Sequence, residues 1–279
     1  MRERASFTAA MIAVSRSLGR VLPEDARLID EPYGERFATP FLRFIARNAG
    51  WLRPVIEGTL ATVQVRTHLL DQALLSFVRQ GGQQALILGA GFDARAWRFR
   101  DALREVRVFE LDHPATQARK RELMPPADEV TFVPWDFETR AMAELPAALA
   151  ALGHDPARPT FMLWEGVTMY LGEAAVDATV RAVATLAAPG SKFVVTYVER
   201  TALVRPSLAR RLVGRLVAGL GEPLRFGFTP SELPGWLEAR GFGLTHDVSF
   251  REAAGALLPP RYHAAFDPLL RVFFADRDA

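Results

Sequence analysis

The spacing of hydrophobic residues changes near residue 80. Before that point, apolar residues recur at helical intervals in three segments, 5–22, 37–49 and 60–78. Beyond Gly81-Gly82, short apolar runs of strand length alternate with helical segments. The change predicts a helical N-terminal cap over 1–80 and an α/β core over 81–279.

Seven strands are expected in the core, near 85–88, 106–111, 130–135, 160–164, 192–198, 242–250 and 268–274. Helical patterns separate the first five, at about 93–103, 114–123, 138–152 and 173–187. Strands that alternate with helices predict an α/β fold with a doubly wound, mostly parallel seven-stranded sheet, covered on both faces.

A basic, leucine-rich stretch interrupts the alternation after the fifth strand, and we expect a helical lid insertion over 201–228. Its arginines could attract an anionic substrate or could form a solvated helix face. Thr229 and Pro230 then have the residue types favoured at an N-cap and a first helical position. They predict a helix that begins there and ends at Gly241.

Composition narrows the class of protein. Hydrophobic residues make up 49% of the 279 residues, the charged fraction is 24% and the formal charge is +2, so we expect no nucleic-acid partner. The chain has no cysteine, and its five histidines do not pair at metal-ligand spacing, so we expect no metal site and a cytoplasmic location. No stretch approaches the ~20 apolar residues of a membrane span, so we expect no membrane partner.

The most informative motif is Leu88-Gly89-Ala90-Gly91-Phe92-Asp93, in which a buried strand ends in a glycine turn that opens a helix. Glycine at Gly89 and Gly91 lets a ligand approach the backbone closely. A dinucleotide site usually has a third glycine, where this chain has Ala94. The carboxylate of Asp93 would repel a pyrophosphate but is compatible with a cationic sulfonium ligand.

Acidic residues also follow the next three strands, namely Asp112, Asp136 and Glu165. The carboxyl ends of parallel strands meet at one edge of a sheet, where ligands of open α/β folds bind. Asp112 is placed to accept hydrogen bonds from ribose hydroxyls, and Asp136 from an adenine amine with Phe137 against the ring. Together with Asp93, these acids indicate S-adenosylmethionine as the cofactor.

At this point the chain resembles the leucine carboxyl methyltransferase family and its bacterial relatives, a branch of the class I S-adenosylmethionine-dependent methyltransferases. The resemblance covers roughly residues 15–200. It rests on these motifs: Leu88 to Arg98, Val108 to Pro114, Lys120-Arg121, Trp135-Asp136-Phe137, Glu165 to Leu171, Val65-Arg66-Thr67-His68 and Glu31-Pro32-Tyr33. Three residues depart from the family pattern, Ala94 for threonine, Phe137 for leucine and Glu31 for aspartate.

The resemblance implies roles for individual residues. Arg66 would contact the methionine carboxylate of the cofactor, and Glu165 would lie near its amino group. Gly89 and Gly91 would line the cofactor. Asp112 would hold the ribose, and Asp136 with Phe137 would hold the adenine.

The predicted function is methyl transfer to a carboxylate or hydroxyl oxygen of a small-molecule acceptor, such as a secondary metabolite. Tyr197, at the end of the fifth strand, is a candidate base for a hydroxyl acceptor or else an ordinary strand-end residue. A carboxylate acceptor would need no base. The alternatives are a methyltransferase for protein C-terminal carboxylates, an NAD-dependent oxidoreductase and a non-catalytic binding protein with the same fold.

Overall fold

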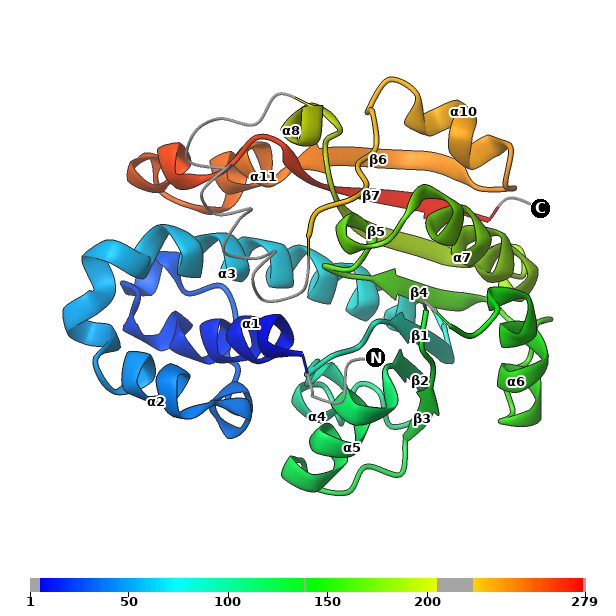
Figure 1. Cartoon of the computed structure of the whole chain (residues 1–279), viewed down its shortest axis with the longest axis horizontal. Coiled ribbons are helices and arrows are strands. Elements are labelled where there is room, and N and C mark those ends of the chain that lie inside the picture. Colours follow the sequence, from blue (N-terminus) through cyan, green and yellow to red (C-terminus); the bar gives the residue numbers. More distant parts are fainter. Residues whose placement is uncertain (1–5, 138, 205–222, 278–279) are drawn as a thin grey trace.

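The computed structural model describes residues 6–137, 139–204 and 223–277 (Figure 1). The strands are β1 Gln84–Leu88, β2 Arg107–Asp112, β3 Val130–Pro134, β4 Thr160–Trp164, β5 Lys192–Val198, β6 Gly243–Ser249 and β7 Leu270–Asp276. The helices are α1 Phe7–Ser17, α2 Pro40–Arg47, α3 Ala49–Arg79, α4 Arg95–Arg98, α5 Pro114–Leu123, α6 Leu145–Ala151, α7 Glu173–Leu186, α8 Thr201–Val204, α10 Leu233–Glu238 and α11 Phe250–Leu257.

The seven strands form a single sheet in the order β3-β2-β1-β4-β5-β7-β6. The first five pair in parallel, and β7 runs antiparallel between β5 and β6. Leu88 of β1 is level with Leu111 of β2 and Trp164 of β4, so these strands end at the same edge. The prediction of a doubly wound, mostly parallel seven-stranded sheet is confirmed, and all seven strands lie where the sequence placed them.

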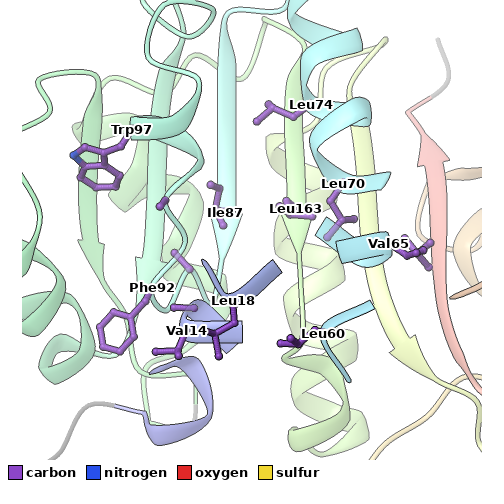
Figure 2. Packing of buried hydrophobic residues seen from close by; sticks show 14 of the residues in the cluster. Val14, Leu18, Leu60, Val65, Leu70, Leu74, Ile87, Phe92, Trp97 and Leu163 are labelled. Atoms are coloured by element: carbon purple, nitrogen blue, oxygen red, sulfur yellow. The ribbon is translucent and has the colours of Figure 1, made fainter. Parts of the chain in front are cut away.

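Each face of the sheet carries its own hydrophobic cluster. Side chains alternate between faces along a strand, so Ile87 and Leu163 join one cluster while Leu86 and Trp164 join the other. Figure 2 shows the first cluster, in which α1, the 3-10 helix that follows it and α3 pack on the sheet through the following residues: Val14, Leu18, Leu60, Val65, Leu70 and Leu74. Helices α6, α7 and α10 cover the second face. The N-terminal helices and the sheet therefore share one core.

The N-terminal helices differ in extent from their predicted bounds. Helix α1 begins after Ser6, whose side chain accepts a hydrogen bond from the Ala9 N–H, and a 3-10 helix follows it over Leu18–Val21. Helix α3 starts directly after Asn48 and contains Pro54, whereas the pattern predicted a helix only over 60–78. In these additional turns, Ile56 also packs against the core.

Prolines explain two further differences. The helix predicted from 138 begins at Leu145, preceded by a 3-10 helix over Met142–Glu144, and the helix predicted from Pro230 begins at Leu233. Pro146 and Pro234 each lie in the first turn of the observed helix. An earlier start would have placed them in helix interiors, where proline removes a hydrogen bond and its ring clashes with the preceding turn.

Of two other segments, one differs from the prediction and one lies largely outside the described residues. The helix expected over 93–103 is reduced to the single turn of α4, after which turns lead to β2. Of the predicted lid over 201–228, residues 205–222 lie outside the described residues, and α8 is its described start. Among the described residues, no helix combines the length and apolar character needed to cross a membrane.

Candidate functional site

The glycine turn after β1 has the backbone conformation that its sequence predicts. Gly89 and Gly91 have φ values of 63° and 50°, in the left-handed region that favours glycine. A Cβ added at Gly89 would lie 2.4 Å from Val167 Cγ2. The Gly91 N–H donates to Asp112 Oδ2 at 2.6 Å, and the His113 N–H donates to Asp112 Oδ1 at 2.7 Å. The acid at the end of β2 therefore holds the glycine turn.

Asp112 is largely enclosed by this arrangement. Burial raises the pKa of its carboxyl group, and the two backbone N–H donors partly offset that effect. Each carboxylate oxygen has a second lone pair beyond the one used by the backbone. The side chain can therefore still accept hydrogen bonds from a ligand while it supports the turn.

Three arginines converge on Glu165, which follows β4. Arg16 Nη2 and Arg66 Nε each lie 2.8 Å from Glu165 Oε1, and Arg95 Nη1 lies 2.9 Å from Oε2. Burial by itself would raise the pKa of Glu165, but the positive charges of Arg16, Arg66 and Arg95 outweigh it and hold that pKa well below its usual range. Glu165 is therefore a buried carboxylate that is ionised at neutral pH.

The carboxylate of Asp93, at the glycine turn, is paired with Arg95. Its Oδ1 accepts from the Arg95 backbone N–H at 2.8 Å, and its Oδ2 contacts Arg95 Nη1. On α3, Asp71 Oδ1 accepts from Arg95 Nε at 2.7 Å. Burial opposes ionisation of Asp93, but the charges of Arg95 and Arg16 outweigh it and lower its pKa. Asp93 and Asp71 thus hold Arg95 in place against Glu165.

The charged cluster continues away from the sheet. Arg98 Nη2 pairs with Asp71 Oδ2, and Arg98 Nε lies 3.7 Å from Glu31 Oε2. The cluster, hereafter the buried charge network, contains equal numbers of cations and anions: Arg16, Arg66, Arg95, Arg98, Glu31, Asp71, Asp93 and Glu165. A buried charge is tolerated only when it is paired, which explains the balance.

The acid after β3 lies beside a pocket at the same edge of the sheet. Asp136 and Phe137 follow Trp135, and both are half-buried. The pocket has a volume of about 340 Å³ and is lined by Phe137, Leu171, Gly172, Ala175 and Arg225. Arg225 is held near the loop after β4 because its backbone N–H donates to the Met169 carbonyl at 2.7 Å.

Tyr197 is separate from the buried charge network. Its side chain is 1% exposed and packs in the second hydrophobic cluster. Its hydroxyl donates to Asp247 at 3.0 Å and accepts from Arg271 Nε at 3.1 Å. Burial and the negative charge of Asp247 raise the pKa of the phenol well above its usual value.

The structure brings three of the predicted residues into the buried charge network, namely Arg66, Asp93 and Glu165, and places Gly91 against Asp112. Sequence reasoning assigned no site role to the other five members of the network, namely Arg16, Arg95, Arg98, Asp71 and Glu31. Arg16 and Asp71 lie on helices α1 and α3, on faces that point into the core. A charged residue on an otherwise apolar helix stripe is the signal that could have identified them.

Comparison with known proteins identifies the family. A family model described as leucine carboxyl methyltransferase matches residues 9–184. A Frankia alni protein named as an S-adenosyl-L-methionine-dependent methyltransferase is 30% identical over 256 residues, covering 86% of this chain and 84% of that protein. A Mycolicibacterium gilvum protein with the same designation is 32% identical over 240 residues, covering 78% of this chain and 71% of that protein.

Solved structures share the fold. A protein from Thermobifida fusca named as a methyltransferase has a TM-score of 0.64 at 17% identity, covering 100% of this chain and 97% of that chain. A DUF574 family protein from Streptomyces avermitilis has a TM-score of 0.63, also at 17% identity, covering 98% of each chain. The resemblance noted in the sequence is thus confirmed, and the chain belongs to the leucine carboxyl methyltransferase family, as a methyltransferase that uses S-adenosylmethionine.

Proposed function

We propose that the protein is an O-methyltransferase that methylates a carboxylate or hydroxyl oxygen of a small-molecule acceptor, such as a secondary metabolite. The observation that best supports the proposed cofactor site is the ion pair of Arg66 and Glu165, in which Arg66 Nε lies 2.8 Å from Glu165 Oε1. A cation and an anion side by side match the two charges of an amino acid zwitterion, which is the methionine end of S-adenosylmethionine.

Open space beside Glu165 supports this placement of the methionine end of the cofactor. A Cβ added at Gly166, next to Glu165, would meet no atom within 4 Å. Among the described residues, Arg95 Nη2 is buried and has no hydrogen-bond partner. Open space and an unused donor beside Glu165 fit a polar ligand at this point.

The proposed roles follow the edge of the sheet. Arg66, with Arg16 beside it, binds the methionine carboxylate, and Glu165 binds the amino group. Asp112 holds the ribose and the glycine turn together, and Gly89 and Gly91 line the cofactor.

Further along the same edge, Asp136 and Phe137 hold the adenine in the pocket beside Arg225. Asp93 acts indirectly, by positioning Arg95. We therefore regard the segment 1–80 as a helical cap, because it supplies Arg16 and Arg66 to the site.

The bound cofactor supplies a methyl group on a positively charged sulfur, which an acceptor oxygen can attack without further activation of the donor. The chain then has to align the acceptor and exclude water. The hydroxyl of Tyr197, the candidate base, donates to Asp247, and its raised pKa keeps the phenol protonated at neutral pH, so it has no capacity to take up a proton from an acceptor. This favours an acceptor carboxylate, which is already ionised near neutral pH.

Two measurements test the proposal. Calorimetry should detect binding of S-adenosylhomocysteine and no binding of NADH. Binding of NADH without binding of S-adenosylhomocysteine would instead favour an oxidoreductase. Next, transfer of a radiolabelled methyl group should be measured with carboxylic acids, with the corresponding alcohols and phenols, and with peptides that end in a free carboxylate. Methyl esters release methanol in mild base and methyl ethers do not, so this step separates the two acceptor classes.

The same assay separates a small acid from a protein C-terminus. We expect base-labile label on a small acid and none on the peptides. We propose a cytoplasmic location, with which a chain that has no cysteine is compatible.

A further inference from the structure

The outer end of the α2–α3 pair exposes large hydrophobic side chains. Seven such side chains are exposed among the described residues, and four of them fall within this short segment: Phe41 62%, Phe44 62%, Trp51 84% and Val55 82%. Single exposed apolar residues are ordinary, but a concentration of them marks a contact surface. Phe41 and Phe44 share one face of α2, and Trp51 and Val55 share one face of α3, because residues three or four apart are neighbours on a helix.

This segment projects from the edge of the sheet that carries the charge network. Helix α3 ends shortly before β1 begins, and Figure 2 shows that the helix, from Leu60 to Leu74, runs opposite to the strand that carries Ile87. Its first half therefore lies toward the carboxyl end of β1. Trp51 precedes Arg66 by about 22 Å along the helix axis, at ~1.5 Å per residue. In Figure 1 the α2–α3 turn forms the left end of the molecule.

The same surface is cationic. Arg43 and Arg47 are exposed on α2, and no ion pair is found for either among the described residues. On α3, Arg53 lies 3.5 Å from Glu57, which compensates its charge. Aromatic rings and unpaired arginines therefore occur together at this end of the molecule.

We propose that this surface docks on an anionic lipid bilayer. We call it the α2–α3 tip and define it by the following residues: Phe41, Arg43, Phe44, Arg47, Trp51 and Val55. Aromatic side chains that enter the headgroup region, with arginines that pair with lipid phosphates, are the combination that holds a helix at a membrane surface. The tip is a projecting end of the chain, and a deformable bilayer can surround projecting rings.

A second copy of this chain fits the tip less well. Two copies related by a two-fold axis would bring the same face of each together, and one interface would then hold Arg43 and Arg47 of both copies, whose like charges oppose association. Our expectation of no membrane partner rested on the absence of a spanning segment. A surface contact needs no span, so that expectation has to be narrowed to membrane-spanning segments. The inference does not depend on the acceptor that the enzyme methylates.

The test uses the full chain and vesicles of defined composition. The protein should sediment with vesicles of equal parts phosphatidylglycerol and phosphatidylcholine, and much less with phosphatidylcholine alone. The variants Phe44→Ser/Trp51→Ser and Arg43→Gln/Arg47→Gln should each lower the sedimented fraction at least about fivefold. The control variants Leu152→Ser and Arg104→Gln, at exposed positions outside the tip, should bind like the unaltered protein.

Two results would overturn the inference. The first is equal sedimentation of the unaltered protein and the tip variants with the anionic vesicles, including no sedimentation of either. The second is a dimer in sedimentation velocity that Phe44→Ser/Trp51→Ser abolishes, which would assign the tip to a second copy. Binding of S-adenosylhomocysteine by the tip variants shows that they are folded and keeps this test separate from that of the methyltransferase activity.

Discussion

Arg66 on α3 and Glu165 after β4 are far apart in the chain, yet Arg66 Nε lies 2.8 Å from Glu165 Oε1. The pair connects the N-terminal helices to the carboxyl edge of the sheet. Arg16 and Arg95 contact the same carboxylate, so one acid organises cations from α1, α3 and α4. The geometry of the proposed methionine site therefore depends on Glu165 more than on any one of the arginines.

The variant Glu165→Gln should weaken binding and stability together. It keeps the shape of the side chain but leaves three buried guanidinium groups without their shared carboxylate. Loss of one partner of a buried ion pair costs about 3–5 kcal/mol of unfolding free energy. We expect affinity for S-adenosylhomocysteine to fall at least about tenfold, which corresponds to ~1.4 kcal/mol.

Calorimetry at a temperature where the variant is folded by circular dichroism, together with urea unfolding, measures both effects. Glu105→Gln is the matched control, because the Glu105 side chain is 79% exposed. Unchanged affinity in Glu165→Gln would remove Glu165 from the proposed cofactor site.

Asp112→Ala tests the proposed ribose position. The substitution removes the acceptor for the Gly91 and His113 N–H groups as well as the proposed ribose contacts. Affinity for S-adenosylhomocysteine should fall by about tenfold or more, since hydrogen bonds to a charged group contribute roughly 1.5–3 kcal/mol. The comparison is with Asp101→Ala, a substitution at an exposed turn. An affinity within a factor of about two of the unaltered protein contradicts the ribose assignment, since even one such bond is worth more.

The strands could be predicted from the sequence because they are buried on both faces. Runs such as Leu86-Ile87-Leu88 and Phe161 to Trp164 are apolar at every position, since one side chain in two enters each cluster. Helix ends were predicted less well, because Pro146 and Pro234 decide them and a pattern of apolar residues does not reveal which turn a proline occupies.

The site could be predicted only in part, for a different reason. Acids at strand ends are visible in a sequence because topology brings strand ends together. Asp71 and Arg95 lie on different helices and meet across space, so the sequence does not show that they are neighbours. The sequence also could not show that Asp93 is already paired with Arg95, because that depends on the single turn of α4.

Tyr197→Phe should distinguish a structural tyrosine from a base. Removing the hydroxyl deletes its hydrogen bond to Asp247 and the one that it accepts from Arg271 Nε, while Arg271 Nη2 still lies 2.9 Å from Asp247 Oδ2. We expect a loss of about 1–2 kcal/mol in unfolding free energy and a kcat within about threefold of the unaltered enzyme. Urea unfolding and steady-state kinetics with an identified acceptor provide the two values. A kcat reduced by about 100-fold or more with unchanged stability would instead identify Tyr197 as a base.

The variant Lys120→Met should extend the fall of the unfolding free energy with rising pH to higher pH values. Lys120 Nζ lies 2.6 Å from Glu110 Oε2, and both side chains are fully buried. Burial raises the pKa of Glu110 to about 7, although Lys120 partly offsets the effect. In the unfolded chain the carboxyl group ionises near its ordinary value of 4.5. Between these pH values the folded protein holds more protons than the unfolded one, so this carboxyl group makes stability fall as pH rises.

Without Lys120 the pKa of Glu110 rises further and that fall extends to higher pH. The difference in unfolding free energy between the unaltered protein and Lys120→Met should therefore change little up to about pH 7 and grow by up to ~1.4 kcal/mol by pH 8, because one proton contributes ~1.4 kcal/mol per pH unit above that pKa. Urea unfolding at both pH values measures it. The double variant Glu110→Gln/Lys120→Met has no buried charge at this point and should regain much of the loss near pH 8, with little pH dependence from this pair. An equal loss at both pH values, or a double variant no more stable than Lys120→Met, would show that charge pairing is not what stabilises this part of the core.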